Sequence, residues 1–200
     1  QQAKLIGSDS HPADLFGFSD ALSGRTAVIG AYRDDDQGEW SGSAYVFALR
    51  PGGSWRQEAK LLASDGAIFD TFGWTVAVSG NTAVVGAQHD NDNGFSAGSA
   101  YVFTRHRGGS WTEQAKLLAD DGTARDQFGR SVAISGDTAL VGAFRDSDLG
   151  FETGSAYAFV LASDGGPDAG VDAGLDGGFD GGFDAGFDGL IERFEPATIA

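Results

Sequence analysis

Apolar and polar residues alternate in short runs along most of the chain, and turn-forming residues separate these runs. Apolar side chains alternate at Val76 and Val78, and the same alternation returns at Val132 and Ile134. A period of two is the pattern of a half-buried β-strand. The turn Ser79-Gly80-Asn81 follows the first of these runs, and its glycine and asparagine favour a hairpin between antiparallel strands. No segment has a helical period, so the sequence predicts an all-β fold.

The chain also contains an internal repeat. Three motifs each occur three times at intervals of 56 residues. These motifs are Gly-Ser-Ala-Tyr (from Gly42, Gly98 and Gly154), Phe-Gly (from Phe16, Phe72 and Phe128) and Ala-Lys-Leu (from Ala3, Ala59 and Ala115). Three independent motifs in one register indicate a repeat architecture. We place the repeats at residues 1–162, in units of approximately 1–50, 51–106 and 107–162.

Each repeat predicts four short antiparallel strands. The expected strands are 55–62, 72–78, 82–87 and 99–103 in one copy, and 111–118, 128–134, 138–143 and 155–159 in the next. Four antiparallel strands per repeat are typical of the blades of a β-propeller. The sequence therefore predicts three four-stranded propeller-type blades. Because closed rings have about 4–8 blades, three are too few to close a ring.

The residues of the repeated motifs resemble those of a known family. Phe128-Gly129-Arg130-Ser131-Val132-Ala133 followed by Ala139-Leu140-Val141-Gly142-Ala143 resembles the FG-GAP repeat, and the two earlier copies match likewise. This resemblance covers roughly residues 2–160. It implies the blades found in integrin α-subunit heads and in many bacterial surface proteins, and hence a non-enzymatic module at the outside of a cell.

Two departures from the family pattern limit what the resemblance implies. The proline that usually ends the motif is replaced by Tyr32, Gln88 and Phe144. The calcium loop of integrin blades lies between the first two strands, where this chain has only tight turns. The calcium ligands of that family therefore have no matching positions here.

The net charge of the chain limits the classes of molecule that it is expected to bind. The chain has 13 lysine and arginine residues against 29 aspartate and glutamate residues, for a net charge of -16. Nucleic acid is excluded as a partner, because phosphate binding requires a basic surface. No apolar run approaches the roughly 18 residues of a membrane span, so we expect no membrane insertion. We interpret Gln1 as the start of a mature bacterial exported protein whose signal peptide has been removed, with a cloned fragment as the alternative.

Aspartates in two connecting segments of each repeat are candidate metal ligands. The pattern D-x-D-x-G places pairs of aspartates between the second and third strands of each blade: Asp34 and Asp36, Asp90 and Asp92, Asp146 and Asp148. A second set precedes the first strand of each blade: Asp9 and Asp14, Asp65 and Asp70, Asp121 and Asp126. Alternating carboxylates before a glycine suit a hard cation, so we expect Ca²⁺. The alternative is that these aspartates only close turns.

Blade topology predicts that both aspartate sets lie at one end of the sheets, with Arg50, Arg56, Arg105 and Arg107 at the other. Tyr45, Tyr101 and Tyr157 are assigned to the core.

No serine–histidine–acid order, metalloprotease helix or phosphate loop is present, so we expect no enzyme. Stacking on a glycan is an alternative role for Trp40 or Trp74.

Unpaired strands at both ends of the repeat region suggest self-association. A strand expected at residues 2–6 has no blade before it, and the last blade lacks a fourth strand after Phe159. The first strand of one molecule would complete the last blade of another, giving a ring or a filament. The expected function is an extracellular structural or adhesive protein stabilised by calcium. The alternative is a module of a larger surface protein that binds a protein or glycan ligand.

The composition changes from about residue 163. Residues 163–189 form an Asp/Gly-rich low-complexity tail, and residues 190–200 form a short C-terminal segment. Such a composition is typical of a flexible linker. The alternative is a tail that docks on a neighbouring subunit, because an apolar residue opens each four-residue unit after the first.

Overall fold

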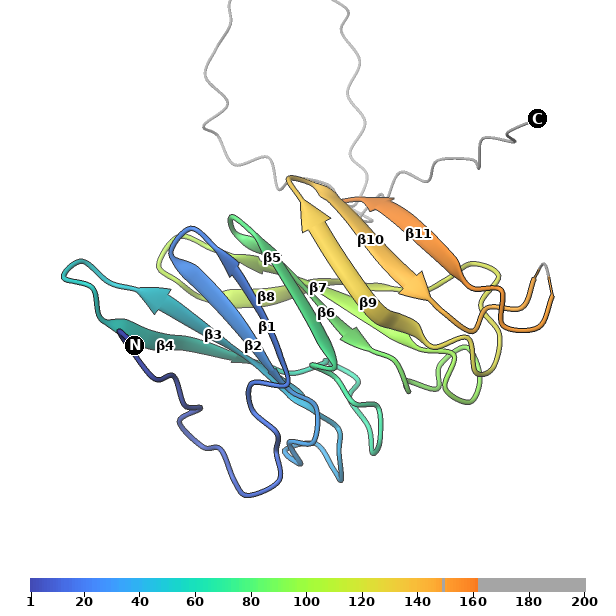
Figure 1. Ribbon diagram of the computed structural model, residues 1–200, viewed down its shortest axis with the longest axis horizontal. Coiled ribbons are helices and arrows are strands. Elements are labelled where there is room, and N and C mark those ends of the chain that lie inside the picture. The colour runs from blue at the N-terminus through green and yellow to red at the C-terminus, as the bar shows by residue number, and fades with distance from the viewer. Residues whose placement is uncertain (149, 162–200) are drawn as a thin grey trace, which may run out of the picture.

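The computed structural model describes residues 1–148 and 150–161 and contains three antiparallel β-sheets side by side (Figure 1). The tail segments predicted at 163–189 and 190–200 lie outside the described residues. The first sheet has the order β1-β2-β3-β4, the second β5-β6-β7-β8 and the third β11-β10-β9. Their bounds are β1 Ser19–Ser23, β2 Thr26–Ala31, β3 Ser43–Leu49, β4 Trp55–Leu61, β5 Thr75–Ser79, β6 Thr82–Ala87, β7 Ser99–Arg105, β8 Trp111–Leu117, β9 Phe128–Ser135, β10 Thr138–Ala143 and β11 Ser155–Val160. The all-β prediction is confirmed, as a set of open sheets that corresponds to incomplete propeller blades.

Two predicted strand positions differ from the structure. Strand β5 begins at Thr75 rather than at Phe72, because regular pairing with β6 starts with Thr75 opposite Gly86, whereas the Phe72 amide donates to the Ser41 carbonyl of the first sheet's loop. Residues 2–6 were expected to form a strand, and this expectation is wrong for the single chain, where they belong to no sheet. The equivalent residues Ala59, Lys60 and Leu61 pair with β3, whereas residues 2–6 have no sheet beside them to pair with.

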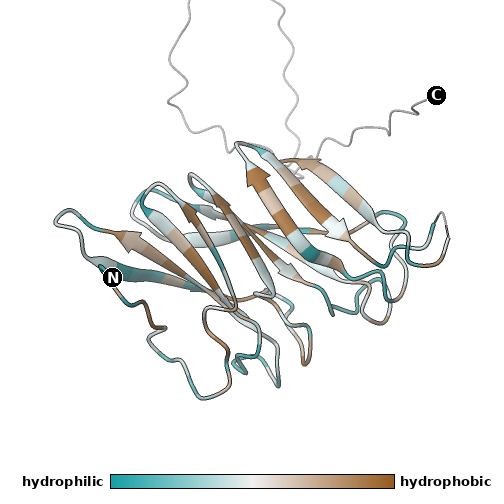
Figure 2. Ribbon diagram, in the orientation of Figure 1, coloured by the Kyte–Doolittle hydropathy of each residue, from teal (hydrophilic) through white to brown (hydrophobic). Residues whose placement is uncertain are grey.

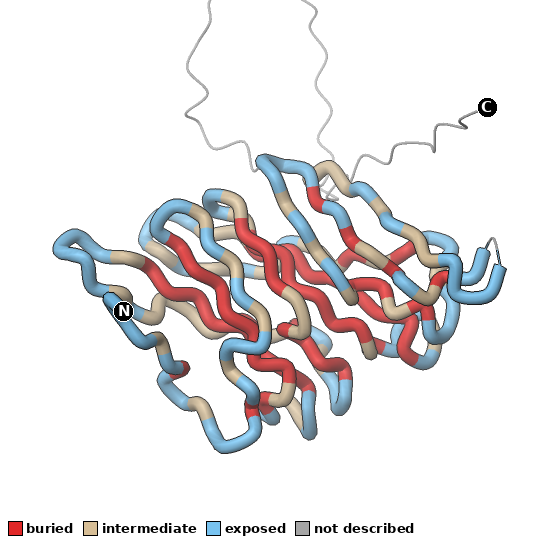
Figure 3. Tube along the Cα trace, viewed as in Figure 1, coloured by how far each residue is buried: buried red, intermediate tan, exposed pale blue. Residues whose placement is uncertain are grey.

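The hydrophobic core lies between the sheets rather than within one of them. Val28, Val46 and Leu61 of the first sheet pack against residues of the second sheet such as Val85 and Phe103. Figure 2 shows apolar stretches along strands of all three sheets, and Figure 3 shows that burial is nearly continuous through the middle of the stack. Each sheet is therefore stabilised mainly by covering the face of its neighbour.

Pairs of glycines let the backbones of adjacent sheets touch. A Cβ atom added at Gly30 would lie 2.0 Å from the Gly73 carbonyl oxygen, and one added at Gly42 would lie 2.0 Å from the Phe72 carbonyl oxygen. Gly42 and Phe72 also form an isolated parallel bridge. The second and third sheets repeat this contact, with Gly86 and Gly98 against Phe128 and Gly129. The repeated Phe-Gly and glycine motifs are thus the two sides of one contact between sheets.

Replacing one of these glycines tests the contact. Gly86→Ala places a methyl group against the Gly129 carbonyl, which belongs to backbone that cannot move away cheaply. We expect a loss of about 1–3 kcal/mol in the free energy of unfolding, as for other overpacked sites. Urea denaturation at low protein concentration measures this loss.

Gly142→Ala is the matched control, since Gly142 holds the equivalent place in the third sheet. The closest atom to its added Cβ is the Ser131 hydroxyl oxygen, which can rotate away, so the expected loss is smaller. Equal losses in the two variants would contradict the role assigned to the sheet contact.

Candidate functional site

The loop between β2 and β3 holds a buried carboxylate. Asp34 is 3% exposed, and one of its oxygens accepts a hydrogen bond from the Asp36 amide at 3.2 Å. Its other oxygen accepts from the Tyr45 hydroxyl at 2.9 Å and the Ser43 hydroxyl at 3.0 Å. The Gly42 amide closes the loop by donating to the Asp34 carbonyl at 2.8 Å. This short loop therefore directs the Asp34 carboxylate back toward strand β3.

Three carboxylates converge on one lysine at this point. The Lys60 ammonium nitrogen lies 2.9 Å from Asp9, 2.9 Å from Asp34 and 2.7 Å from Asp36. Tyr45 also donates to Asp9 at 2.9 Å, so its hydroxyl joins the two connecting segments. We call Asp9, Asp34, Asp36, Tyr45 and Lys60 the first cluster.

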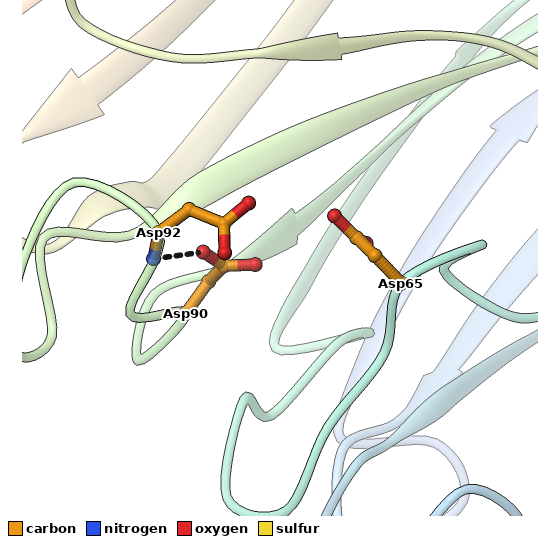
Figure 4. A group of neighbouring side chains, drawn as sticks. All are labelled: Asp65, Asp90 and Asp92. Atoms are coloured by element: carbon orange, nitrogen blue, oxygen red, sulfur yellow. Dashed lines mark hydrogen bonds between the residues drawn. The ribbon is translucent and has the colours of Figure 1, made fainter.

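The second sheet carries the same arrangement. Asp65, Asp90 and Asp92 point toward one another (Figure 4), with one oxygen of each within 4.8 Å of the others. The Lys116 ammonium nitrogen lies 2.7, 2.8 and 2.6 Å from these three carboxylates. The Tyr101 hydroxyl donates to Asp65 and Asp90, in each case at 2.8 Å. These five residues form the second cluster.

The third cluster consists of Asp121, Asp146, Asp148 and Tyr157. The Tyr157 hydroxyl donates to Asp121 at 2.8 Å and to Asp146 at 2.7 Å. Within residues 1–148 and 150–161, no lysine or arginine forms a salt bridge with these aspartates. The reason is topological, because the lysines of the other two clusters come from β4 and β8 and the third sheet has no equivalent strand in the described part.

The pKa values reflect this difference. Burial alone would lower the pKa of Lys116, but hydrogen bonds to Asp65, Asp90 and Asp92 outweigh burial and raise it. Burial would likewise raise the pKa of Asp65, and hydrogen bonds from Lys116 and Tyr101 instead bring it below its ordinary value. In the third cluster, the negative charge of Asp146 raises the pKa of Asp148. Lys116 thus favours the ionised form of Asp65.

The predicted aspartates of the preceding segments divide into two roles. Asp9, Asp65 and Asp121 belong to the clusters. Asp14, Asp70 and Asp126 are also buried, but each accepts a hydrogen bond from an amide of its own loop, as Asp70 does from Ala67 at 2.7 Å. Burial raises the pKa of Asp70 to about 6. These three residues close turns beside the clusters.

The lysines and tyrosines of the clusters were not predicted as site residues. A signal was present, because Ala-Lys-Leu and Gly-Ser-Ala-Tyr repeat at the same interval as the aspartates. The tyrosines were assigned to the core because they alternate with phenylalanines, and their rings are indeed packed there: Tyr45 and Tyr101 are fully buried. Only their hydroxyl groups reach the carboxylates.

Two of the four arginines predicted for the other end of the sheets, Arg50 and Arg105, meet there around a glutamate that was not predicted. Glu58, whose side chain is 6% exposed, lies 2.6 Å from Arg105 and 3.5 Å from Arg50. The described residues thus have the acidic clusters at one end and an arginine–glutamate group at the other.

Removal of a cluster lysine tests its role. Stability from the lowered pKa of Asp65 is present above the ordinary value of 3.8 and is lost as the pH falls through the folded value. We therefore expect Lys116→Met to lose about 1–3 kcal/mol at pH 7, for a partly exposed charge cluster, and progressively less at a pH well below 3.8. Urea denaturation at the two pH values measures the loss.

Arg56→Met is the control, because Arg56 is exposed and forms no ion pair among the described residues. It should change stability by less than about 0.5 kcal/mol at either pH. A cost of Lys116→Met that does not depend on pH would show that the lysine acts through packing instead of charge.

Comparison with known proteins identifies the repeat. The family model described as FG-GAP repeat matches residues 1–47, 55–103 and 111–159. A search of curated proteins found no match. Proteins of this family are repeat or binding modules without catalytic activity and are typically extracellular. The described residues include no helix capable of crossing a membrane. With three matched repeats across most of its length, the chain belongs to the FG-GAP repeat family.

Proposed function

We propose that this protein is an extracellular structural or adhesive module that associates head-to-tail with further copies of itself. In this arrangement the outer face of the third sheet of one copy packs against the first sheet of the next. The single observation that carries the proposal is the exposure of an apolar face whose two counterparts in the same chain are buried between sheets.

The exposed face belongs to β10 and β11. Leu140 is 50% exposed, whereas its equivalents Val84 and Val28 are both 0% exposed. Ala156 and Ala158 are also exposed, whereas the equivalent Ala100 and Val102 are 0% and 3% exposed. These repeat positions are buried wherever another sheet follows. We call Leu140, Gly142, Ala156 and Ala158 the outer face.

The first sheet offers the surface that fits this face. Leu22 on β1 is 66% exposed, whereas its equivalent Val78 packs against the preceding sheet at 9%. A Cβ atom added at Gly17 would meet nothing within 4 Å, whereas one at Gly73 would lie 2.1 Å from the Ser43 carbonyl oxygen. The Phe16-Gly17 motif is thus available for the contact that Phe72-Gly73 makes inside the chain.

A second copy is therefore the occupant we propose for the outer face. The contact is heterologous, because the two copies use different surfaces. Such a contact gives a ring if the rotation between copies closes and a filament if it does not. Burial of apolar surface that is exposed in one copy would drive the association.

A charged residue in the outer face tests the association. Sedimentation velocity from about 1 to 100 µM should show concentration-dependent growth of the wild type, because standard interfaces bind in or below this range. Leu140→Asp should weaken the association at least about 30-fold, the effect of losing a central contact. Circular dichroism should show the same β-sheet signal in both proteins.

Phe95→Asp is the control, since Phe95 is 68% exposed and lies in a loop of the second sheet, away from both proposed surfaces. It should associate like the wild type. A wild type that stays monomeric would contradict the proposal and favour the ligand-binding alternative. The candidate surface for that alternative is the aromatic group of Phe18, Tyr32 and Trp74, whose ring centroids lie 4.5–4.8 Å apart.

The proposal includes Ca²⁺, and we assign it to the third cluster of the single chain. The donors there are of the right chemical kind, because aspartate oxygens are hard ligands that Ca²⁺ binds, although among the described residues only Asp65, Asp90 and Asp92 bring three oxygens within 4.8 Å of one another. The fit is poor in the first two clusters, where the ammonium nitrogens of Lys60 and Lys116 lie 2.6–2.9 Å from the same carboxylates. A second cation there would have to displace the lysine.

Calcium titration at low protein concentration tests this assignment. We expect Ca²⁺ to raise the melting temperature with a Kd of about 10⁻⁴–10⁻³ M, as in extracellular modules. Asp148→Asn should abolish the effect, and the matched change Asp36→Asn in the first cluster should preserve it. A melting temperature unaffected by Ca²⁺ or by a chelator would remove calcium from the proposal.

A further inference from the structure

The three clusters have three candidate lysines, but one of these lysines forms no ion pair with any cluster among the described residues. Lys60 and Lys116 each lie in an Ala-Lys-Leu motif, and the third such motif contains Lys4. Each motif precedes an aspartate of a cluster by the same distance, so that Lys60 precedes Asp65 as Lys4 precedes Asp9. Residues 162–200 contain no lysine. Within the sequence, Lys4 is therefore the remaining counterpart of Lys60 and Lys116.

Lys4 is available for a partner. It is exposed, and it forms no ion pair with any of the residues that the structure describes. Its neighbour Leu5 packs against the first sheet, which keeps this segment on the side of the molecule that carries Phe16 and Gly17. The segment therefore lies on the surface that the proposed association presents to another copy.

The register of the first two sheets shows where such a lysine goes. Lys60 on β4 is paired directly with Tyr45 on β3, and Lys116 on β8 is paired directly with Tyr101 on β7. Strand β11 carries the corresponding Tyr157, and within the described residues its outer edge is not paired with another strand. A strand added at this edge in the same register would place a lysine opposite Tyr157.

We propose that Lys4 of one copy completes the third cluster of another copy, with residues 2–6 added as a fourth strand beside β11. This inference rests on the proposed head-to-tail association and names the contact that sets its register. The Lys4 ammonium group would meet Asp121, Asp146 and Asp148 as Lys116 meets Asp65, Asp90 and Asp92, and in associated chains it would take the place that we assign to Ca²⁺ in the single chain. Residues 2–6 would also gain the strand conformation that their sequence predicts.

Charge complementarity supports this occupant. The first two clusters each set one ammonium group among three carboxylates, and the third sets none there among the described residues. Charge-assisted hydrogen bonds of this kind are stronger than neutral ones and fix geometry as well as energy. The apolar outer face can supply affinity, whereas this ion cluster selects one register.

Carbodiimide cross-linking of mixed isotopes tests the contact directly. Unlabelled and ¹⁵N-labelled chains are mixed, treated with a zero-length carbodiimide and analysed by mass spectrometry of peptides. We expect a mixed-isotope peptide that joins Lys4 to Asp121 or Asp148. Lys60–Asp36 and Lys116–Asp92 are internal positive controls, and these links should stay within one isotope.

The outcome separates this inference from the proposed function. If the chains associate in sedimentation but Lys4 forms no link to the third cluster, the inference is wrong and the association stands. If the chains do not associate at all, both are wrong. Lys4 links that occur only within single isotopes, with no mixed-isotope form, would also overturn the inference, because they would place the lysine in its own chain.

A charge exchange provides a second test. Lys4→Glu should weaken association at least tenfold, equivalent to about 1.4 kcal/mol, because it sets a carboxylate against three others. Combining Lys4→Glu with Asp148→Lys should restore at least part of the loss. Arg56→Met is the control that removes an exposed positive charge elsewhere, and it should leave association unchanged. No rescue by the double variant, or an equal loss in Arg56→Met, would contradict the inference.

Discussion

The close approach of backbones between adjacent sheets is the contact on which the rest of this structure depends. It requires glycine at two places in one sheet and a Phe-Gly pair in the next, and side chains at these glycines would collide with carbonyl oxygens. Once the backbones touch, the apolar faces on either side are brought into contact and become buried. Each carboxylate cluster, in turn, joins the loop of one sheet to the segment that precedes that sheet.

Lysine serves in these clusters as a cation that belongs to the protein. Three carboxylates at this distance would repel one another, and their shared ammonium group offsets this repulsion while tying three separate segments together. An ion pair of this kind requires the fourth strand of a sheet to be in place. Electrostatic stability is therefore coupled to the completion of each sheet, and an incomplete sheet retains an unbalanced negative site.

Much of the fold follows from local sequence, and parts of the site do not. Alternation at Val76 and Val78 and the glycine turns were sufficient to predict strands, and the repeat interval was sufficient to predict three equivalent sheets. Whether residues 2–6 form a strand was not predictable in this way. A strand needs another strand to pair with, and the sequence pattern does not indicate whether one is present. The loop that contains Asp34 and Asp36 was predicted as a candidate site from the spacing of its aspartates. Lys60 was missed because a lysine in a strand normally points to solvent, and only its pairing opposite Tyr45 turns it toward the carboxylates.

The clusters also have a consequence for how such a chain can grow by duplication. Each lysine comes from one 56-residue repeat unit while the carboxylates it neutralises come largely from the preceding unit, so the folding unit is offset from the copied unit. Insertion or loss of a whole unit would preserve every internal cluster. An array of any number of units would still have one unpaired cluster lysine in its first unit and one acidic cluster without a lysine in its last unit. Such an array would therefore have two different ends, whatever its length.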